Sequence, residues 1–210
     1  MAEAAGRPRR SRARLPAAQR RQQIMAATCE LIADCGFWGL SMRDVADRCG
    51  LTVPGLLHYV GSKVGLLVAV LEHRDREDAR SLRVQLGVDE EHVPDEWSDG
   101  GPEGVDLRRL CEATMRRNAG QPEIVRLFAV LAVESLNPDH PAHDYFAARQ
   151  ARVVSSFAAL AKELTDRPEL LARQIVSMMD GVQLQWLRDP GTIDLVQEWE
   201  AAAEALFGRL

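Results

Sequence analysis

The chain has 210 residues, of which 46% are hydrophobic and 27% are charged. This composition is typical of a folded globular protein and excludes a disordered chain. No apolar run approaches the ~20 residues that a membrane-spanning helix needs, and the N-terminus lacks the apolar segment of a secretory signal. We therefore expect a cytoplasmic protein with no membrane partner.

The four cysteines, Cys29, Cys35, Cys49 and Cys111, lie within apolar helical patterns and lack the paired spacing of metal ligands. We interpret them as small buried hydrophobic residues in a reducing compartment. No metal and no cofactor is expected.

The net charge of −5 is unevenly distributed along the chain. Residues 1–63 carry ten basic and five acidic residues, whereas the remaining residues carry 16 basic and 26 acidic ones. A basic N-terminal segment on an acidic body favours a polyanionic partner for that segment. The alternative is a basic tail that only keeps the protein soluble.

Hydrophobic periodicity predicts helices along almost the whole chain. Residues 1–15 have no periodicity and are expected to form a flexible basic arm. Apolar residues then recur at spacings of three and four from Pro16 to Cys35, and Gly36 is expected to end this helix. The acidic residues 87–104, rich in Gly and Pro, are expected to form the long loop. Further helices are predicted at about 42–49, 52–60, 62–86, 105–119, 122–136, 141–164, 168–188 and 192–208.

Two short helices joined by a tight turn are predicted between residues 42 and 59. Ser41 and Thr52 are residue types that cap helix N-termini. Helices in such a pair cross closely, which requires a small residue at the crossing, here Ala46, and a residue at ease with positive φ in the turn, here Gly50. The pattern indicates a helix-turn-helix, and an unrelated helical hairpin is the alternative.

The surrounding sequence narrows this interpretation. The segment Gly36-Phe-Trp-Gly-Leu-Ser-Met42 precedes the helix pair, and His58-Tyr-Val-Gly-Ser-Lys63 follows it. This order resembles the DNA-binding domain of TetR-family regulators over about residues 20–67. Leu57 and Val60 replace aromatic residues of the family pattern, and because both stay apolar we expect them to repack the core.

The resemblance implies an all-α fold with three parts. Residues 1–15 would be the arm, residues 16–62 a three-helix DNA-binding domain with the helix-turn-helix, and residues 63–210 a larger helical domain for ligand binding and dimerisation. No segment alternates with period two for long enough to indicate a strand.

Eight residues are predicted to contact DNA. The N-terminal residues of the second helix of a helix-turn-helix lie nearest the bases in the major groove. Arg43 is the expected guanine or phosphate contact, and Lys63 would form an anion site with the exposed N–H groups at a helix start. A solvated surface role is the alternative for both and for His58. The full set is Arg43, Thr52, Val53, Pro54, Gly55, His58, Tyr59 and Lys63.

The last two predicted helices resemble the dimerisation helices of the family. Gly181, in mid-helix, costs about 1 kcal/mol relative to alanine, which a close approach between helices would explain. The alternative is that these faces only close the core of one chain. The predicted homodimer interface comprises Ile175, Met178, Gly181, Val182, Trp186, Val196, Trp199 and Ala203.

By the same resemblance, the helices at 105–164 would form the ligand-binding region, and a small-molecule ligand would lie among helices 105–188. Glu134 is of interest because it falls on an otherwise apolar helix. For each residue of the predicted lining, the alternative is an ordinary position in the hydrophobic core. The predicted lining comprises Met115, Phe128, Leu131, Glu134, Tyr145, Phe146, Met178 and Gln183.

One pair of histidines, His140 and His143, lies three residues apart at a predicted helix start, a spacing that suggests metal ligands. Two histidines alone rarely hold a structural ion. Asp139 is better explained as the N-cap of that helix.

The sequence thus predicts a sequence-specific transcriptional regulator that binds double-stranded DNA. A repressor released from a palindromic operator by a small molecule is favoured, and a ligand-independent regulator or an activator with the same helix-turn-helix is the alternative. No nucleophile elbow, zinc-protease motif or phosphate-binding glycine loop is present, so an enzyme is not expected.

Overall fold

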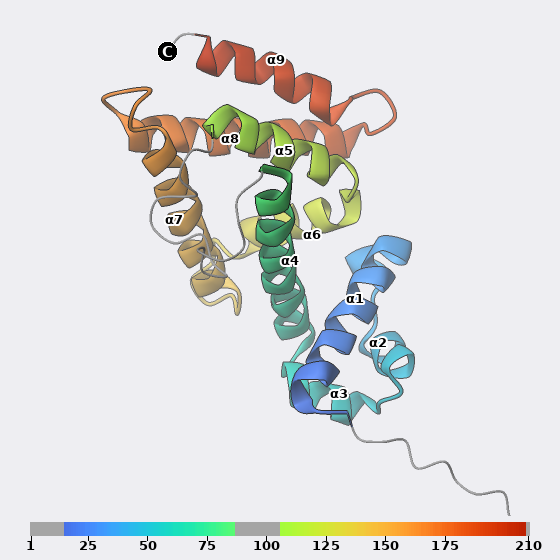
Figure 1. Cartoon of the computed structure of the whole chain (residues 1–210). Coiled ribbons are helices and arrows are strands. Elements are labelled where there is room, and N and C mark those ends of the chain that lie inside the picture. Colours follow the sequence, from blue (N-terminus) through green and yellow to red (C-terminus); the bar gives the residue numbers. More distant parts are fainter. Residues whose placement is uncertain (1–14, 87–105, 209–210) are drawn as a thin grey trace, which may run out of the picture.

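The computed structural model describes residues 15–86 and 106–208. Within these ranges all regular secondary structure is helical (Figure 1), which confirms the predicted all-α fold. The predicted loop at 87–104 and all but the last residue of the predicted arm lie outside the described residues. The helices are α1 (Ala17–Gly39), α2 (Met42–Cys49), α3 (Val53–Val60), α4 (Lys63–Leu86), α5 (Leu107–Ala119), α6 (Pro122–Glu134), α7 (His143–Leu160), α8 (Pro168–Arg188) and α9 (Leu195–Phe207).

Gly36 ends the regular helix within α1, as predicted, and a short second helical segment follows it. Its φ of +68° lies in the left-handed region, and helical residues continue to Gly39 beyond it. The bend turns Phe37 inward, where it is 3% exposed. Glycine is the residue that adopts this backbone conformation without steric cost.

The predicted helix-turn-helix is present, with the expected local bonds. Ser41 Oγ accepts the N–H of Asp44 at 3.1 Å, and Thr52 Oγ1 accepts the N–H of Gly55 at 3.2 Å. Gly50 adopts a left-handed conformation with φ 64° and ψ 35°. The predicted caps and the turn glycine are therefore confirmed.

Helix α4 leaves the N-terminal helices and runs into the body of the protein (Figure 1). At its start Ser62 Oγ accepts the N–H of Gly65 at 2.9 Å. A Cβ atom at Gly65 would lie 2.3 Å from the carbonyl oxygen of Val60. Only glycine permits this close approach between the end of α3 and the first turn of α4.

Two hydrophobic cores hold the described helices together. The first contains buried residues of α1–α4 with others of α6 and α7, such as Leu56, Leu66, Leu127 and Phe146. The second joins α5, α8 and α9 and includes the fully buried Trp199. The first core continues past residue 62, so the N-terminal helices and the body pack as one unit at this point.

Two sequence expectations are corrected. Helix α7 begins at His143 with Ala142 at its N-cap, so Asp139 is not the cap; its N–H instead donates to Oδ1 of Asn137 at 3.1 Å. Cys35 is exposed rather than buried, and its thiol donates to the Leu31 carbonyl at 3.0 Å.

No single helix in the described ranges is long and apolar enough to cross a membrane. One bent pair, Val53–Val60 with Lys63–Arg80, meets that criterion by length and composition alone. Across the same ranges no group of three or more His, Cys, Asp or Glu side chains is arranged to hold a metal ion.

Candidate DNA-binding surface and ligand cavity

The outer surface of α3 and the first turn of α2 present polar and small residues to solvent. Arg43, Thr52, Pro54 and His58 are exposed, whereas Val53, Gly55 and Tyr59 are half-buried. Val53 and Tyr59 pack against the first core. On the opposite side of the helix pair, Val45 and Leu56 are completely buried and Ala46 is 1% exposed. One side of the helix pair is therefore packed in the core, and the other side is accessible to solvent.

Lys63 is exposed at the start of α4, but its ammonium group already has one partner. Its Nζ donates to the Leu40 carbonyl at 2.6 Å, which ties α4 to the segment between α1 and α2. Two of its three protons remain for other acceptors. Arg20 makes a similar tie, donating to the Cys49 carbonyl at 3.2 Å.

Four of the eight residues predicted for the dimer interface lie inside the chain itself. Ile175, Trp199 and Ala203 are fully buried and Trp186 is 6% exposed, all in the second core. For these residues the alternative reading, closure of one chain's own core, is correct. Periodicity alone does not distinguish a face that packs inward from one that meets a partner.

The other predicted interface residues are partly or fully accessible. Val182 and Val196 are half-buried, and Met178 is exposed on the outer side of α8. A Cβ atom at Gly181 would meet no heavy atom within 4 Å. Leu184, one turn further along α8, is also exposed and was not predicted.

A cavity of about 790 Å³ lies among α4, α5, α6, α7 and α8. Such a volume is within the range of ligand sites in proteins. Its lining includes apolar side chains, among them Phe128, Phe157 and Met179, and a group of charged residues.

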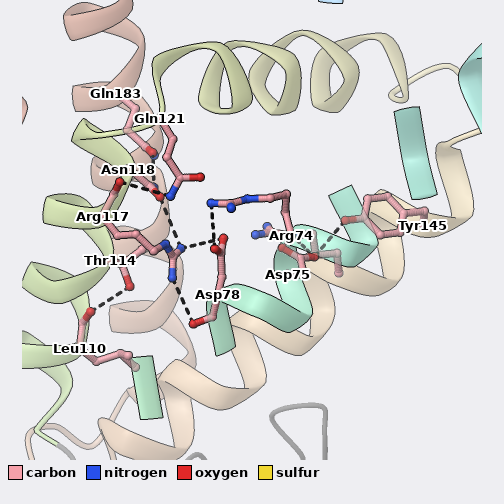
Figure 2. Close-up of polar contacts among 11 residues, drawn as sticks. Arg74, Asp75, Asp78, Leu110, Thr114, Arg117, Asn118, Gln121, Tyr145 and Gln183 are labelled. Carbon is pink, nitrogen blue, oxygen red and sulfur yellow. Dashed lines mark hydrogen bonds and ion pairs between the residues drawn. The ribbon is translucent and has the colours of Figure 1, made fainter. Parts of the chain in front are cut away.

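The charged part of the cavity wall is centred on α4 (Figure 2). Asp75 accepts from the Tyr145 hydroxyl at 2.9 Å and from Nε of Arg149 at 2.9 and 3.2 Å. Asp78 forms ion pairs with Arg74 at 3.1 Å and with Arg117 at 3.0 Å. These contacts tie α4 to α5 and α7.

Arg117 and Arg149 differ in how well their carboxylate partners offset burial. Burial raises the pKa of Asp78 although Arg117 and Arg74 oppose it, and burial lowers the pKa of Arg117 although Asp78 opposes it. For Arg149 burial also disfavours the charged form, but Asp75 more than offsets this and the pKa of Arg149 is raised. The cost of burying Arg117 is thus less well offset by Asp78 than the cost of burying Arg149 is by Asp75.

The structure places only part of the predicted lining at this cavity. Phe128, Tyr145 and Gln183 line it. The five other residues do not, because three are packed in the hydrophobic cores and two are exposed elsewhere on the surface. They are Met115, Leu131 and Phe146 in the cores and Glu134 and Met178 on the surface.

Sequence reasoning missed the contribution of α4 to the cavity. Its charged residues follow one another at 74–78, a pattern that is typical of a solvated helix face. The available signals were weak: Arg74 and Asp78 are four residues apart, and Asp180 interrupts the apolar sequence of α8. Asp180 lines the cavity.

Comparisons with known proteins agree with this arrangement. The family model for bacterial regulatory proteins of the TetR family matches residues 24–70. The transcriptional activator FasR of Mycolicibacterium smegmatis is 40% identical over 59 residues, 28% of this chain and 27% of FasR. The regulator BetI of Stenotrophomonas maltophilia is 26% identical over 172 residues, 80% of each chain. Thus this chain spans about a quarter of FasR and four fifths of BetI.

Solved structures share the fold. The TetR-family transcriptional repressor FadR of Thermus thermophilus, in complex with lauroyl-CoA, superposes with a TM-score of 0.57 at 21% identity, over 89% of this chain and 92% of that one. An exposed helix-turn-helix on an all-helical body defines a DNA-binding transcriptional regulator. Residues 24–70 carry the DNA-binding domain of the TetR family of such regulators, and the comparisons together support a TetR-family regulator.

Proposed function

We propose that the protein is a homodimeric repressor that binds a palindromic operator and is released from it by a small molecule. The observation that carries the proposal is the joint presence of an exposed helix-turn-helix and a cavity against α4, the helix that begins where the helix-turn-helix ends. Each part of the proposal has its own structural support.

DNA contact is supported by the exposed surface of α2 and α3. In this fold class the second helix enters the major groove, so Thr52, Pro54 and His58 would face the DNA. Arg43 has the fork of donors that reads guanine. Lys63, with two free ammonium protons, would reach a phosphate.

A dimer is supported by the outer face of α8. Met178 and Leu184 are large apolar residues in contact with solvent, and Gly181 lies between them with open space where a side chain would be. One helix-turn-helix reads only a few base pairs, and a symmetric pair of chains on a palindrome reads twice as many.

Release by a ligand is supported by the position of the cavity. A ligand there would contact α4 directly, since Leu71, Arg74 and Asp75 are part of the wall. A shift of α4 would change the separation of the two recognition helices, which must lie about one helical turn of DNA, ~34–36 Å, apart.

The proposal is tested by selecting binding sites from random DNA with the purified protein. We expect the selected sequences to be palindromic and the affinity to fall steeply with salt. Arg43→Ala should reduce binding, and Arg109→Ala, an exposed arginine of the body, is the matched control. Selection of no preferred sequence, or equal losses in both variants, would contradict the proposal.

An activator is the second candidate. The 59 residues that match FasR, a protein named as an activator, are the most similar stretch among the relatives described above. A reporter gene behind the selected operator separates the two, because a repressor lowers its expression and an activator raises it.

A further inference from the structure

Three arginines of the cavity wall are arranged around two carboxylates. Three guanidinium groups, those of Arg74, Arg117 and Arg149, share two carboxylates, those of Asp75 and Asp78. The Nε atoms of Arg74 and Arg117 are buried and have no partner among the described residues. A buried donor without an acceptor is unfavourable, so this wall is short of acceptors.

Arg149 has further donors to offer. Both of its bonds to Asp75 use Nε, and its guanidinium carbon lies 4.2 Å from the centroid of the Phe128 ring. Its two terminal nitrogens make no hydrogen bond to a described residue. A guanidinium whose terminal nitrogens are free can bind a carboxylate through parallel N–H groups.

The three arginines also act on one another. Besides burial, the charges of Arg74 and Arg149 contribute to lowering the pKa of Arg117. Asp78 and Asp75 oppose this lowering, and an anion bound among the three arginines would supply an acceptor to nitrogens that lack one.

The rest of the cavity is suited to an apolar group. Its lining includes Ile124, Val125, Phe128, Phe157, Val176 and Met179. The cavity is therefore lined by both guanidinium groups and apolar side chains, and Arg149 lies over the Phe128 ring where the two kinds of side chain meet.

We propose that this cavity binds an amphipathic anion, a carboxylate on an apolar chain, whose carboxylate takes the place of Asp75 and Asp78 on Arg149 and Arg117. The inference rests on the ligand cavity of the proposed function and names its ligand class. Binding would loosen the ties of α4 to α5 and α7, because the same guanidinium groups make those ties.

Three further acidic residues, Asp180, Glu72 and Asp144, line the cavity. Asp180 is close enough to Arg149 to affect its pKa, and burial raises the pKa of Asp180 against the opposing effect of Arg149. When protonated it would donate to the bound carboxylate, and when ionised it would repel it. Asp180, Glu72 and Asp144 are all exposed, so solvent screens their charge.

The experiment uses the full-length, DNA-free protein and three probes with the same ten-carbon chain: decanoate, decanol and decyltrimethylammonium. Binding is measured by calorimetry below the concentration at which the probes form micelles. We expect decanoate to bind once per chain and at least tenfold more tightly than decanol, because hydrogen bonds to a charged group are the stronger ones. Equal binding of decanoate and decanol, or tighter binding of the cation, would overturn the proposal.

Two variants test whether the bound carboxylate replaces Asp75 as the partner of Arg149, and they should change decanoate affinity in opposite directions. Arg149→Gln removes the guanidinium and should weaken decanoate binding about tenfold. Asp75→Asn removes the competing carboxylate while keeping its shape, and should tighten decanoate binding. Arg109→Gln, outside the cavity, is the control and should change neither. Weakening by Asp75→Asn would overturn the displacement, and the wild-type probe series still decides the ligand class if a variant is misfolded by circular dichroism.

Failure of this inference is distinguishable from failure of the proposed function. Operator binding is measured without any probe, and decanoate binding is measured without DNA. Palindromic DNA binding together with no preference for decanoate would refute the anion site alone. Decanoate binding with the expected variant effects, but no specific DNA binding, would refute the proposed function alone.

Discussion

Replacing Gly181 with alanine separates the role of α8 in the chain's own fold from its role in a dimer. Gly181 lies in mid-helix, and a Cβ atom there would meet nothing within 4 Å. Within one chain, alanine should therefore stabilise α8 by about 1 kcal/mol. For a protein of this length that gain raises Tm by roughly 2–4 °C.

A second chain packed at Gly181 would change the result. The added methyl group would overpack the contact, at a cost of about 1–3 kcal/mol for each site, and a two-fold interface contains the site twice. The gain in helix stability is the same in monomer and dimer and cancels in the dissociation constant. We therefore expect the dimer dissociation constant to rise about 30-fold or more.

Sedimentation velocity over a range of concentrations measures the dissociation constant, and thermal unfolding at the same concentrations measures stability. Gly191→Ala is the matched control, because a Cβ atom there also meets nothing within 4 Å but lies in the turn after α8. If Gly181→Ala raises Tm and leaves the dissociation constant unchanged, the dimer interface does not include this face of α8.

Three other changes have expected outcomes. Lys63→Met should flatten the dependence of log K on log salt by roughly two units, about 0.9 for each protomer; an unchanged slope would mean that Lys63 does not contact a phosphate. Gly65→Ala should lower stability by about 1–3 kcal/mol in urea unfolding, because its Cβ would lie 2.3 Å from the Val60 carbonyl; no loss would mean that the α3–α4 junction relaxes. Asp180→Asn should raise Tm only slightly at pH 7, since burial raises the pKa of Asp180 but the residue is exposed and solvent screens its charge. That gain should disappear as the pH falls below the raised pKa, and a gain that persists at pH 3 would exclude ionisation as its cause.

The helices could be predicted from sequence because their signals are local. Ser41 and Thr52 cap their helices through bonds that span three residues, and Gly50 forms a turn through its own backbone angle. Gly36 is a local signal of the same kind, because its positive φ interrupts α1, and the short helical segment after it carries Phe37 into the first core.

The cavity could not be predicted in the same way, because its polar wall is made of pairs that are distant in sequence. Asp75 meets Arg149, and Asp78 meets Arg117. Neither pair has a short, regular sequence separation that would reveal the contact. The sequence pattern places aromatic residues in the helical body but does not distinguish the cavity wall from the hydrophobic core. Phe128 lines the cavity, whereas Phe146, which packs against it, belongs to the first core.

Helix α4 connects the two ends of the proposed mechanism, and this connection has a thermodynamic consequence. Leu66 and Val70 are buried in the same core as Leu56 of α3, and one to two turns further along Asp75 and Asp78 hold the helix to α7 and α5. A close-packed core transmits a displacement instead of absorbing it, so a ligand that breaks these ion pairs biases the position of α3. A ligand shifts that balance only by its differential affinity for the two arrangements, and the coupling is reciprocal. Saturating the protein with operator DNA should therefore weaken decanoate binding by the same factor, roughly 5–150-fold, by which decanoate weakens DNA binding. Two different factors, each measured at equilibrium on the intact dimer, would show that decanoate and DNA do not act through one shared equilibrium of α4.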